Sequence, residues 1–244
     1  TIPLFYSGGK YEFLISNKNK NDALNQIINI TKMDNIPKSP TPISPLSPLS
    51  KLSKLSYIDN VVDLVFTFYE KFGNKDYIGE PVSQTEHMVQ AAMLAEKDCK
   101  SKKIILAALF HDIGHLIGFD EEIPFESMDN LGIQDHEKIG AIFLRKLNIP
   151  SPIPELVEGH VQAKRYLTFK DPEYYNKLSE ASKGTLKHQG GPMTESEAFG
   201  FETNKLYRDM INLRSYDEKA KEINMVIKDL NYYKEMLRDV LKQT

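Results

Sequence analysis

The sequence has a single cysteine, Cys99, among its 244 residues, so no disulfide can form within the chain. One free thiol is typical of a protein kept in a reducing compartment, and we expect a cytoplasmic location. Long apolar runs are also missing, since no segment approaches the roughly 20 residues of a membrane-spanning helix. The first residues show no basic region followed by an apolar core. We therefore expect neither a membrane partner nor a secretory signal.

An excess of either charge is absent as well. The chain carries 31 basic and 34 acidic residues and a net charge of -3. Because this balance creates no long-range attraction to nucleic acid or to anionic membranes, we expect neither as a partner, and any basic site must be local. Hydrophobic residues make up 41% of the chain, which is enough for one core. No pattern in the sequence specifies an oligomeric state.

The first 56 residues differ in amino-acid composition from the rest of the chain. Residues 1–35 are rich in Asn and Lys, with weak signals for a hairpin turn at Phe5–Tyr11 and a short helix at Asp22–Met33. Residues 38–56 read KSPTPISPLSPLSKLSKLS. Repeated proline removes backbone donors and serine competes for the remaining groups, which predicts a disordered linker. We therefore expect a largely irregular N-terminal extension over residues 1–56, acting as a tether.

From Ser56 onward, apolar residues recur at helical spacing and long alternating β-branched runs are absent. Ser83 and Glu86 form a capping box that opens one helix, and Gly73 ends the helix before it. The pattern predicts an all-α domain over residues 57–244. An apolar stripe at residues 58–68 indicates the first helix, and the capping box opens the next. Further helices are expected at residues 104–116, 136–147, 154–167, 194–202, 204–215 and 217–242.

One aspartate lies in a strongly apolar segment. His111 and Asp112 follow Ala107-Ala108-Leu109-Phe110, within a helix that we expect to be buried. An ionised carboxylate there is costly unless a metal or a positive partner offsets its charge. A buried, hydrogen-bonded His-Asp pair is the alternative that involves no metal.

Further histidines favour the metal. His87, His136 and His160 lie on other expected helices, and Asp217 lies at the junction before the last one. Imidazole and carboxylate ligands suit iron, manganese or zinc. Four histidines and two aspartates exceed the needs of one ion, which predicts a two-metal centre. Adjacent side chains on a helix point about 100° apart, so Asp112 can bridge two ions while His111 binds one of them.

This pattern resembles the HD-domain superfamily, whose signature HDIG stands at residues 111–114. It is most similar to the mixed-valent di-iron oxygenases of that superfamily that cleave phosphonates. The resemblance covers most of residues 57–220 and implies an HD-domain helical bundle with two iron ions (Fe²⁺/Fe³⁺). It also implies O₂ and a small anionic substrate, an α-hydroxyphosphonate such as 2-amino-1-hydroxyethylphosphonate. Oxidation would break the carbon–phosphorus bond to give a carboxylic acid, here glycine, and phosphate.

The resemblance also implies roles for residues outside the metal set. Tyr77 and Glu80 match a catalytic lid motif, in which Tyr77 would guard the iron until substrate arrives and Glu80 would support that switch or meet an ammonium group. As isolated residues they would suit any surface loop. Six further residues match positions that hold the substrate: His115, Lys164, Ser182, Thr185, Gln189 and Arg214. His188 matches no position in the pattern.

Physical reasoning about this substrate face leaves alternatives open. Lys164 shares a helix face with His160, but a solvated lysine has the same spacing. Ser182 and Thr185 form a polar face if their segment is helical, and a capped, exposed helix is the alternative. The guanidinium of Arg214 matches a phosphonate, or forms a salt bridge that orients Asp217.

Three other functions compete. An HD phosphohydrolase uses metal ions as Lewis acids to activate water. An inositol-oxygenase-like enzyme shares irons and fold but oxidises a polyol, whereas the cationic residues here favour an anion. A module that binds a ligand without catalysis is disfavoured because all six candidate metal ligands are present. A requirement for oxygen separates the first function from an oxygenase, and metal content separates the third.

Overall fold

The computed structural model describes residues 48–77, 79–120, 125–129 and 131–244, with side chains from residue 54 onward. The turn expected at Phe5–Tyr11 and the helix expected at Asp22–Met33 lie outside these residues. Regular structure in the described ranges is helical, apart from two isolated β-bridges, Asp76 with Ser83 and Ser127 with Ile133. The expected all-α class is confirmed.

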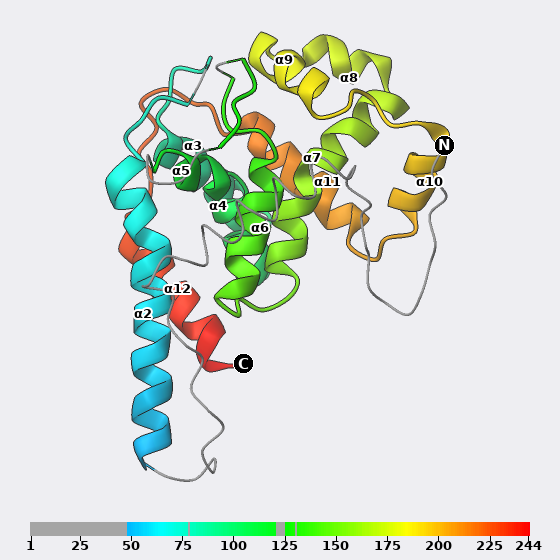
Figure 1. Ribbon diagram of the computed structural model, residues 1–244. Coiled ribbons are helices and arrows are strands. Elements are labelled where there is room, and N and C mark those ends of the chain that lie inside the picture. Colours follow the sequence, from blue (N-terminus) through cyan, green and yellow to red (C-terminus); the bar gives the residue numbers. More distant parts are fainter. Residues whose placement is uncertain (1–47, 78, 121–124, 130) are drawn as a thin grey trace.

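Figure 1 shows the helices in chain order. They are α2 (Pro48–Phe72), α3 (Gln84–Lys97), α4 (Lys102–Phe110), α5 (Ile113–Gly118), α6 (His136–Lys146), α7 (Ile153–Lys170), α8 (Pro172–Lys177), α9 (Glu180–His188), α10 (Glu195–Glu202), α11 (Tyr207–Lys219) and α12 (Leu230–Lys242). The predicted capping box is present at the start of α3, where Ser83 and Glu86 bond each other's backbone.

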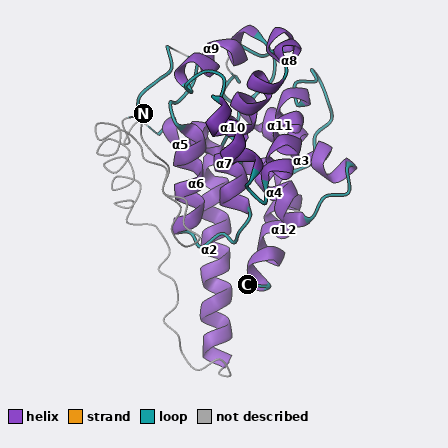
Figure 2. Cartoon of the chain, turned by 90° about the vertical axis from the view of Figure 1, so that its right-hand side faces the viewer, coloured by secondary structure: helices purple, strands orange, loops and turns teal. Residues whose placement is uncertain are grey.

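Helix α2 corrects the expected boundary of the linker. It begins at Pro48, so residues 48–56, which we expected to be disordered, are helical. Proline suits the first turn because its missing N–H would have no helical partner there. The later turns bury Val61, Val65 and Phe66 in the core, where α2 packs on α5 and α12. Its first turns extend past the other helices in both views (Figures 1 and 2).

Five helices form the centre of the domain. α7 packs against α4, α6 and α11, while α3 packs against α4 and α11. Their shared interior is a single apolar core that includes Phe110, Phe143 and Leu156. Because each of these helices also carries a candidate metal ligand at its inner face or end, packing of the core brings the ligands together.

The expected helix 104–116 is two helices. α4 ends at Phe110 and α5 starts at Ile113, so His111 and Asp112 lie in the bend between them. Gly114 explains how closely the chain folds here, since a Cβ at this position would lie 2.0 Å from the carbonyl oxygen of His136. Only glycine allows the start of α5 to approach the start of α6 so closely.

The C-terminal boundaries also differ from expectation. We placed Asp217 at a junction between helices 204–215 and 217–242, but α11 runs without a break through Arg214 and Asp217. Residues 220–229 are then irregular, and only α12 follows. α8 was not expected, whereas α9 meets the condition that Ser182 and Thr185 share a helix.

Candidate metal centre and substrate pocket

Four buried imidazoles are held by the same kind of contact. Each turns its Nδ1 toward a backbone carbonyl oxygen, at 2.9 Å for His87 to Ala220, 2.8 Å for His111 to Ala108, 3.3 Å for His136 to Ile133 and 2.7 Å for His160 to Val157. A carbonyl only accepts hydrogen bonds, so each neutral ring carries its proton on Nδ1. The Nε2 lone pair is therefore free for a metal, as expected of histidine ligands.

The four Nε2 atoms meet in two pairs. Nε2 of His87 lies 3.1 Å from that of His111, and Oδ1 of Asp217 lies 3.3 Å from Nε2 of His87. Nε2 of His136 lies 3.3 Å from that of His160. Lone pairs that face each other at such distances repel unless a proton or a metal cation lies between them. The donor set therefore fits two transition-metal ions.

Asp112 lies between the two pairs. Its Oδ2 is 3.3 Å from Nε2 of His111 and 3.5 Å from that of His87. Its Oδ1 is 3.3 Å from Nε2 of His136 and 3.6 Å from that of His160. One carboxylate oxygen thus faces each pair, which is the geometry expected of a bridging ligand.

The charges of this cluster depend on one another. Burial alone would raise the pKa of Asp112 and Asp217, but nearby His111 and Arg214 hold both well below the ordinary value. Burial likewise opposes protonation of His87, yet the two aspartates raise its pKa to about 9. Burial and the neighbouring histidines lower the pKa of His160 to about 3. Without metal, the fold thus retains two ionised carboxylates that attract a cation.

His115 lies beside the centre and differs from the four other rings. Asp112, His115 and His136 are spaced closely enough to hold an ion. However, Nδ1 of His115 accepts a hydrogen bond from the N–H of Ile133 at 3.0 Å, so the neutral ring carries its proton on Nε2. Burial and then His136 lower its pKa well below the ordinary value, which keeps the ring neutral. It is suited to donate a hydrogen bond rather than to bind metal.

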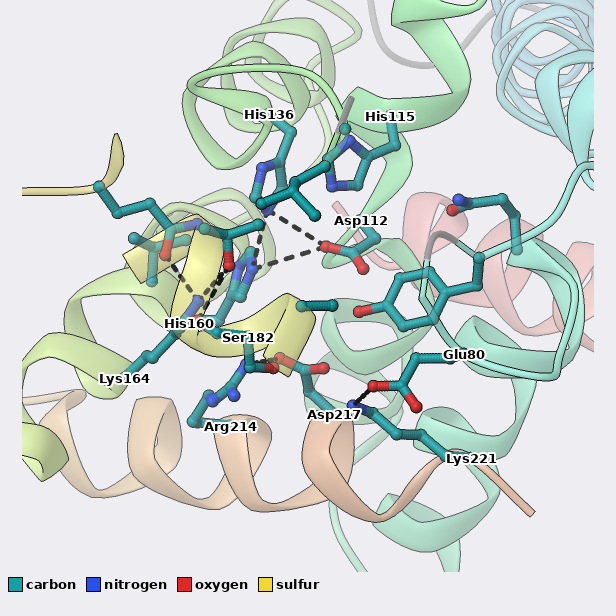
Figure 3. Close-up of a pocket in the computed structure, with 18 of the residues that line it drawn as sticks. Glu80, Asp112, His115, His136, His160, Lys164, Ser182, Arg214, Asp217 and Lys221 are labelled. Carbon is teal, nitrogen blue, oxygen red and sulfur yellow. Dashed lines mark hydrogen bonds and ion pairs between the residues drawn. The ribbon is translucent and has the colours of Figure 1, made fainter. Parts of the chain in front are cut away.

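Lys164 and Arg214 form a cationic face in the same pocket as the metal ligands (Figure 3). Lys164 on α7 donates to Oγ1 of Thr185 at 2.6 Å and to Oε1 of Gln189 at 2.8 Å. Ser182 lines the same pocket one turn earlier on α9. Lys164 is buried, and burial followed by Arg214 lowers the pKa of its amine to about 7. A solvated surface lysine, our alternative, does not describe this residue.

Arg214 is fixed on three sides. Its guanidinium pairs with Asp217, and its Nε lies 2.9 Å from Oε1 of Glu218 and 3.0 Å from the hydroxyl of Tyr174. The salt bridge to Asp217, which we raised as the alternative, is present, and Arg214 still lines the pocket. Sequence reasoning missed Tyr174 and Glu218. Burial raises the pKa of Glu218 to about 7.

The loop between α2 and α3 covers the first histidine pair. The ring of Tyr77 stacks on that of His87, with centroids 3.9 Å apart and planes at 12°. Burial and then Asp112 raise the pKa of the Tyr77 hydroxyl well above its ordinary value. Gly79 has φ +79°, and a Cβ there would lie 2.8 Å from Cβ of Ala181 on α9. The loop therefore packs directly on the helix that carries Ser182 and Thr185.

All predicted site residues except His87 and His111 line one pocket. These two contact lining residues, since His87 stacks on Tyr77 and His111 lies beside Asp112. Sequence reasoning missed several other lining residues: Gln84, Phe119, Leu131, Gly132, Val161, Ala181 and Lys221. Lys221 forms an ion pair with Glu80 (Figure 3). His188, which we left out of the predicted set, is outside this lining and pairs with Asp129 at 3.1 Å.

Comparison with known proteins agrees with this architecture. The HD domain family matches residues 85–233. An uncharacterized protein of Acanthamoeba polyphaga mimivirus is 42% identical over 183 residues, 75% of this chain and 83% of the relative. None of the described helices has both the length and the apolar character needed to cross a bilayer.

Two relatives carry functional names. The [1-hydroxy-2-(trimethylamino)ethyl]phosphonate dioxygenase (glycine-betaine-forming) of Leisingera caerulea is 41% identical over 179 residues, 73% of this chain and 89% of the relative. The hydroxymethylphosphonate dioxygenase of Gimesia maris is 36% identical over 174 residues, 70% of this chain and 84% of the relative. The alignments cover more than two thirds of each chain, and together with the family match they lead to one conclusion: the chain belongs to the HD-domain family and, within it, to the phosphonate dioxygenases.

Proposed function

We propose that this protein is a di-iron oxygenase that uses O₂ to oxidise an α-hydroxyphosphonate and to cleave its carbon–phosphorus bond. The observation that carries the proposal is one pocket that joins a metal centre to two cations. Asp112 faces two imidazole pairs, and it lines this pocket together with His136, His160, Lys164 and Arg214. The names of the two relatives support the reaction class. The resemblance in sequence makes 2-amino-1-hydroxyethylphosphonate, which would give glycine, the first compound to test.

The proposed metal ligands form two groups. His87, His111 and Asp217 would hold one iron, His136 and His160 the other, and Asp112 would bridge them. When bound, the irons, proposed to be an Fe²⁺/Fe³⁺ pair, would supply the redox chemistry that activates O₂ and oxidises the carbinol carbon.

The cationic face would hold the phosphonate. Lys164 would gain charge beside a dianion, because the pKa of its amine, about 7 in this structure, rises when a negative group approaches. Thr185 and Gln189 already orient the Lys164 amine, and the hydroxyl of Ser182 offers a further donor. Arg214, fixed by Glu218 and Tyr174, presents its guanidinium to the same group. His115 would donate its Nε2–H to a substrate oxygen.

The proposed reaction consumes only the phosphonate and O₂. The α-hydroxyphosphonate and O₂ give a carboxylate, hydrogen phosphate and one proton. The C–H bond at the carbinol carbon, the carbinol O–H bond, the C–P bond and the O–O bond of O₂ break, while a second C–O bond to that carbon, a P–O bond and the O–H bond of hydrogen phosphate form. One oxygen atom of O₂ ends in the carboxylate and the other in phosphate, so O₂ is fully reduced and no external reductant is needed.

Tyr77 would serve as the lid that the sequence predicts. Its ring covers His87, and its hydroxyl stays protonated because burial and the aspartates raise its pKa. A cover over reduced iron limits its oxidation when no substrate is present. Glu80 lies one turn further along the same loop and would hold the cover in place through Lys221.

Phosphate release from racemic 2-amino-1-hydroxyethylphosphonate by iron-loaded protein, with and without O₂, tests the proposal. We expect release that depends on both iron and O₂, with metal-free protein as the control. Release without O₂ would instead indicate a phosphohydrolase. If this phosphonate and hydroxymethylphosphonate both stay intact while two irons are bound, the oxygenase acts on a polyol or on another α-hydroxy compound.

A further inference from the structure

We infer, on the basis of the proposed function, that Lys221 determines specificity and that the preferred substrate is an α-hydroxyphosphonate without a cationic group, of which hydroxymethylphosphonate is the simplest. This inference departs from the amine-bearing substrate that the sequence suggests. It rests on which pocket groups remain free to bind a cation.

Only three acidic side chains line the pocket among the described residues: Glu80, Asp112 and Asp217. Asp112 faces both histidine pairs, and Asp217 pairs with His87 and Arg214. Glu80 is therefore the carboxylate that an ammonium group of a substrate would meet. In this structure the amine of Lys221 already pairs with Glu80.

The ion pair is built into the fold. The side chains of Glu80 and Lys221 are 12% and 20% exposed, so water screens their attraction only in part. The Lys221 amine also lies 3.5 Å from the hydroxyl of Ser179, the N-cap of α9. Lys221 follows Ala220, whose carbonyl oxygen accepts from His87. Lys221 is thus positioned by the same backbone segment that orients a metal ligand.

A second observation concerns the aromatic rings. Rings bind ammonium groups over their faces, and Tyr77 and Phe119 line the pocket. One face of Tyr77 stacks on His87. The amine of Lys75 lies 4.5 Å from the centroid of Phe119, in cation–π contact. Lys221 thus contacts Glu80 and Lys75 contacts Phe119, and a substrate cation would compete with both lysines.

The consequence for the reaction is a product without nitrogen. Hydroxymethylphosphonate and O₂ would give formate, hydrogen phosphate and one proton, with the same bonds broken and formed as in the general reaction. The proposed contacts of Lys164 and Arg214 with the phosphonate do not depend on which group is attached to the carbinol carbon.

The test compares three substrates on the iron-loaded protein: hydroxymethylphosphonate, 2-amino-1-hydroxyethylphosphonate and its trimethylammonium analogue. We expect the highest kcat/KM for hydroxymethylphosphonate. In Lys221→Met, Glu80 is free for a substrate cation, so the ratio of kcat/KM for hydroxymethylphosphonate to that for the amine should fall by about 10-fold or more. Glu80→Gln should raise this ratio. Lys221→Arg, which keeps the cation, should leave it close to that of the wild type.

Lys102→Met is the matched control, because it removes a lysine that pairs with Asp239 on the surface. Anaerobic calorimetry gives a second readout without turnover. In Lys221→Met, binding of the amine should strengthen relative to binding of hydroxymethylphosphonate. A wild-type preference for either cationic substrate would overturn the inference, as would an unchanged ratio in an active Lys221→Met protein. If the wild type releases phosphate from none of the three, the proposed function fails and the inference fails with it.

Discussion

Asp112 turns one carboxylate oxygen toward each histidine pair, so a single side chain contacts both candidate metal positions. We predict that Asp112→Ala loses both irons, because a bridging ligand serves each of them. Metal analysis after anaerobic loading measures this, with Asp239→Ala on the surface as the control. A folded Asp112→Ala protein that still binds two irons would show that Asp112 does not bridge.

Lys164 is the buried cation of the substrate face. Lys164→Met should leave the iron content unchanged and raise KM for the phosphonate by about 10- to 100-fold, as expected for the loss of a hydrogen bond to a charged group. Lys170→Met, on the same helix but exposed and paired with Glu202, is the control. Wild-type kinetics in Lys164→Met would mean that the phosphonate binds elsewhere.

At the scale of elements, the contact between α5 and α6 depends on Gly114. Gly114→Ala should lower the free energy of unfolding by about 1–3 kcal/mol, because the added methyl overlaps the carbonyl oxygen of His136 and must push the helices apart. Thermal unfolding followed by circular dichroism measures this effect. Gly200→Ala in α10 is the matched control, since nothing lies within 4 Å of its added Cβ. Equal melting temperatures for both variants would contradict this account.

The helices were predictable where local chemistry specifies them, as at the capping box of Ser83 and Glu86. Three boundaries were not. The bend at His111 and Asp112 depends on the close approach of Gly114 to another helix, which is a tertiary contact. The continuation of α11 through Asp217 has no local signal that composition reveals. Pro48 suits the start of α2, but the repeated Pro and Ser around it predicted disorder instead.

The sequence predicted which residue types form the site better than it predicted which residues contact one another there. Histidine and aspartate in apolar helices indicated metal, and the structure brings these residues together. The pairing of Glu80 with Lys221 joins residues 141 positions apart in the chain. Tyr174 contacts Arg214 from 40 positions away. No sequence spacing reports such contacts, because they arise only when α8 and the loop after α11 pack beside the pocket.

For the whole molecule, metal should act as a large stabilising ligand. The raised pKa of His87, about 9 against an ordinary 6.5, stabilises the metal-free fold fully below pH 6.5, and this contribution is lost as pH rises toward 9. Iron must displace that proton. The increase in melting temperature on adding Fe²⁺ under anaerobic conditions should therefore grow between pH 6.5 and pH 9. An increase that is constant over this range would show that His87 does not bind metal.

The four imidazoles are oriented by carbonyl oxygens of the main chain. A main-chain carbonyl survives every side-chain substitution, so mutation of neighbouring residues leaves the tautomers of the ligands in place. The lid loop and α9 are separate stretches of sequence from these anchors, whereas the segment after α11 supplies one of them, the carbonyl of Ala220. Evolution can therefore vary the part of the pocket that selects the group attached to the carbinol carbon, while the metal ligands and their orientation stay unchanged.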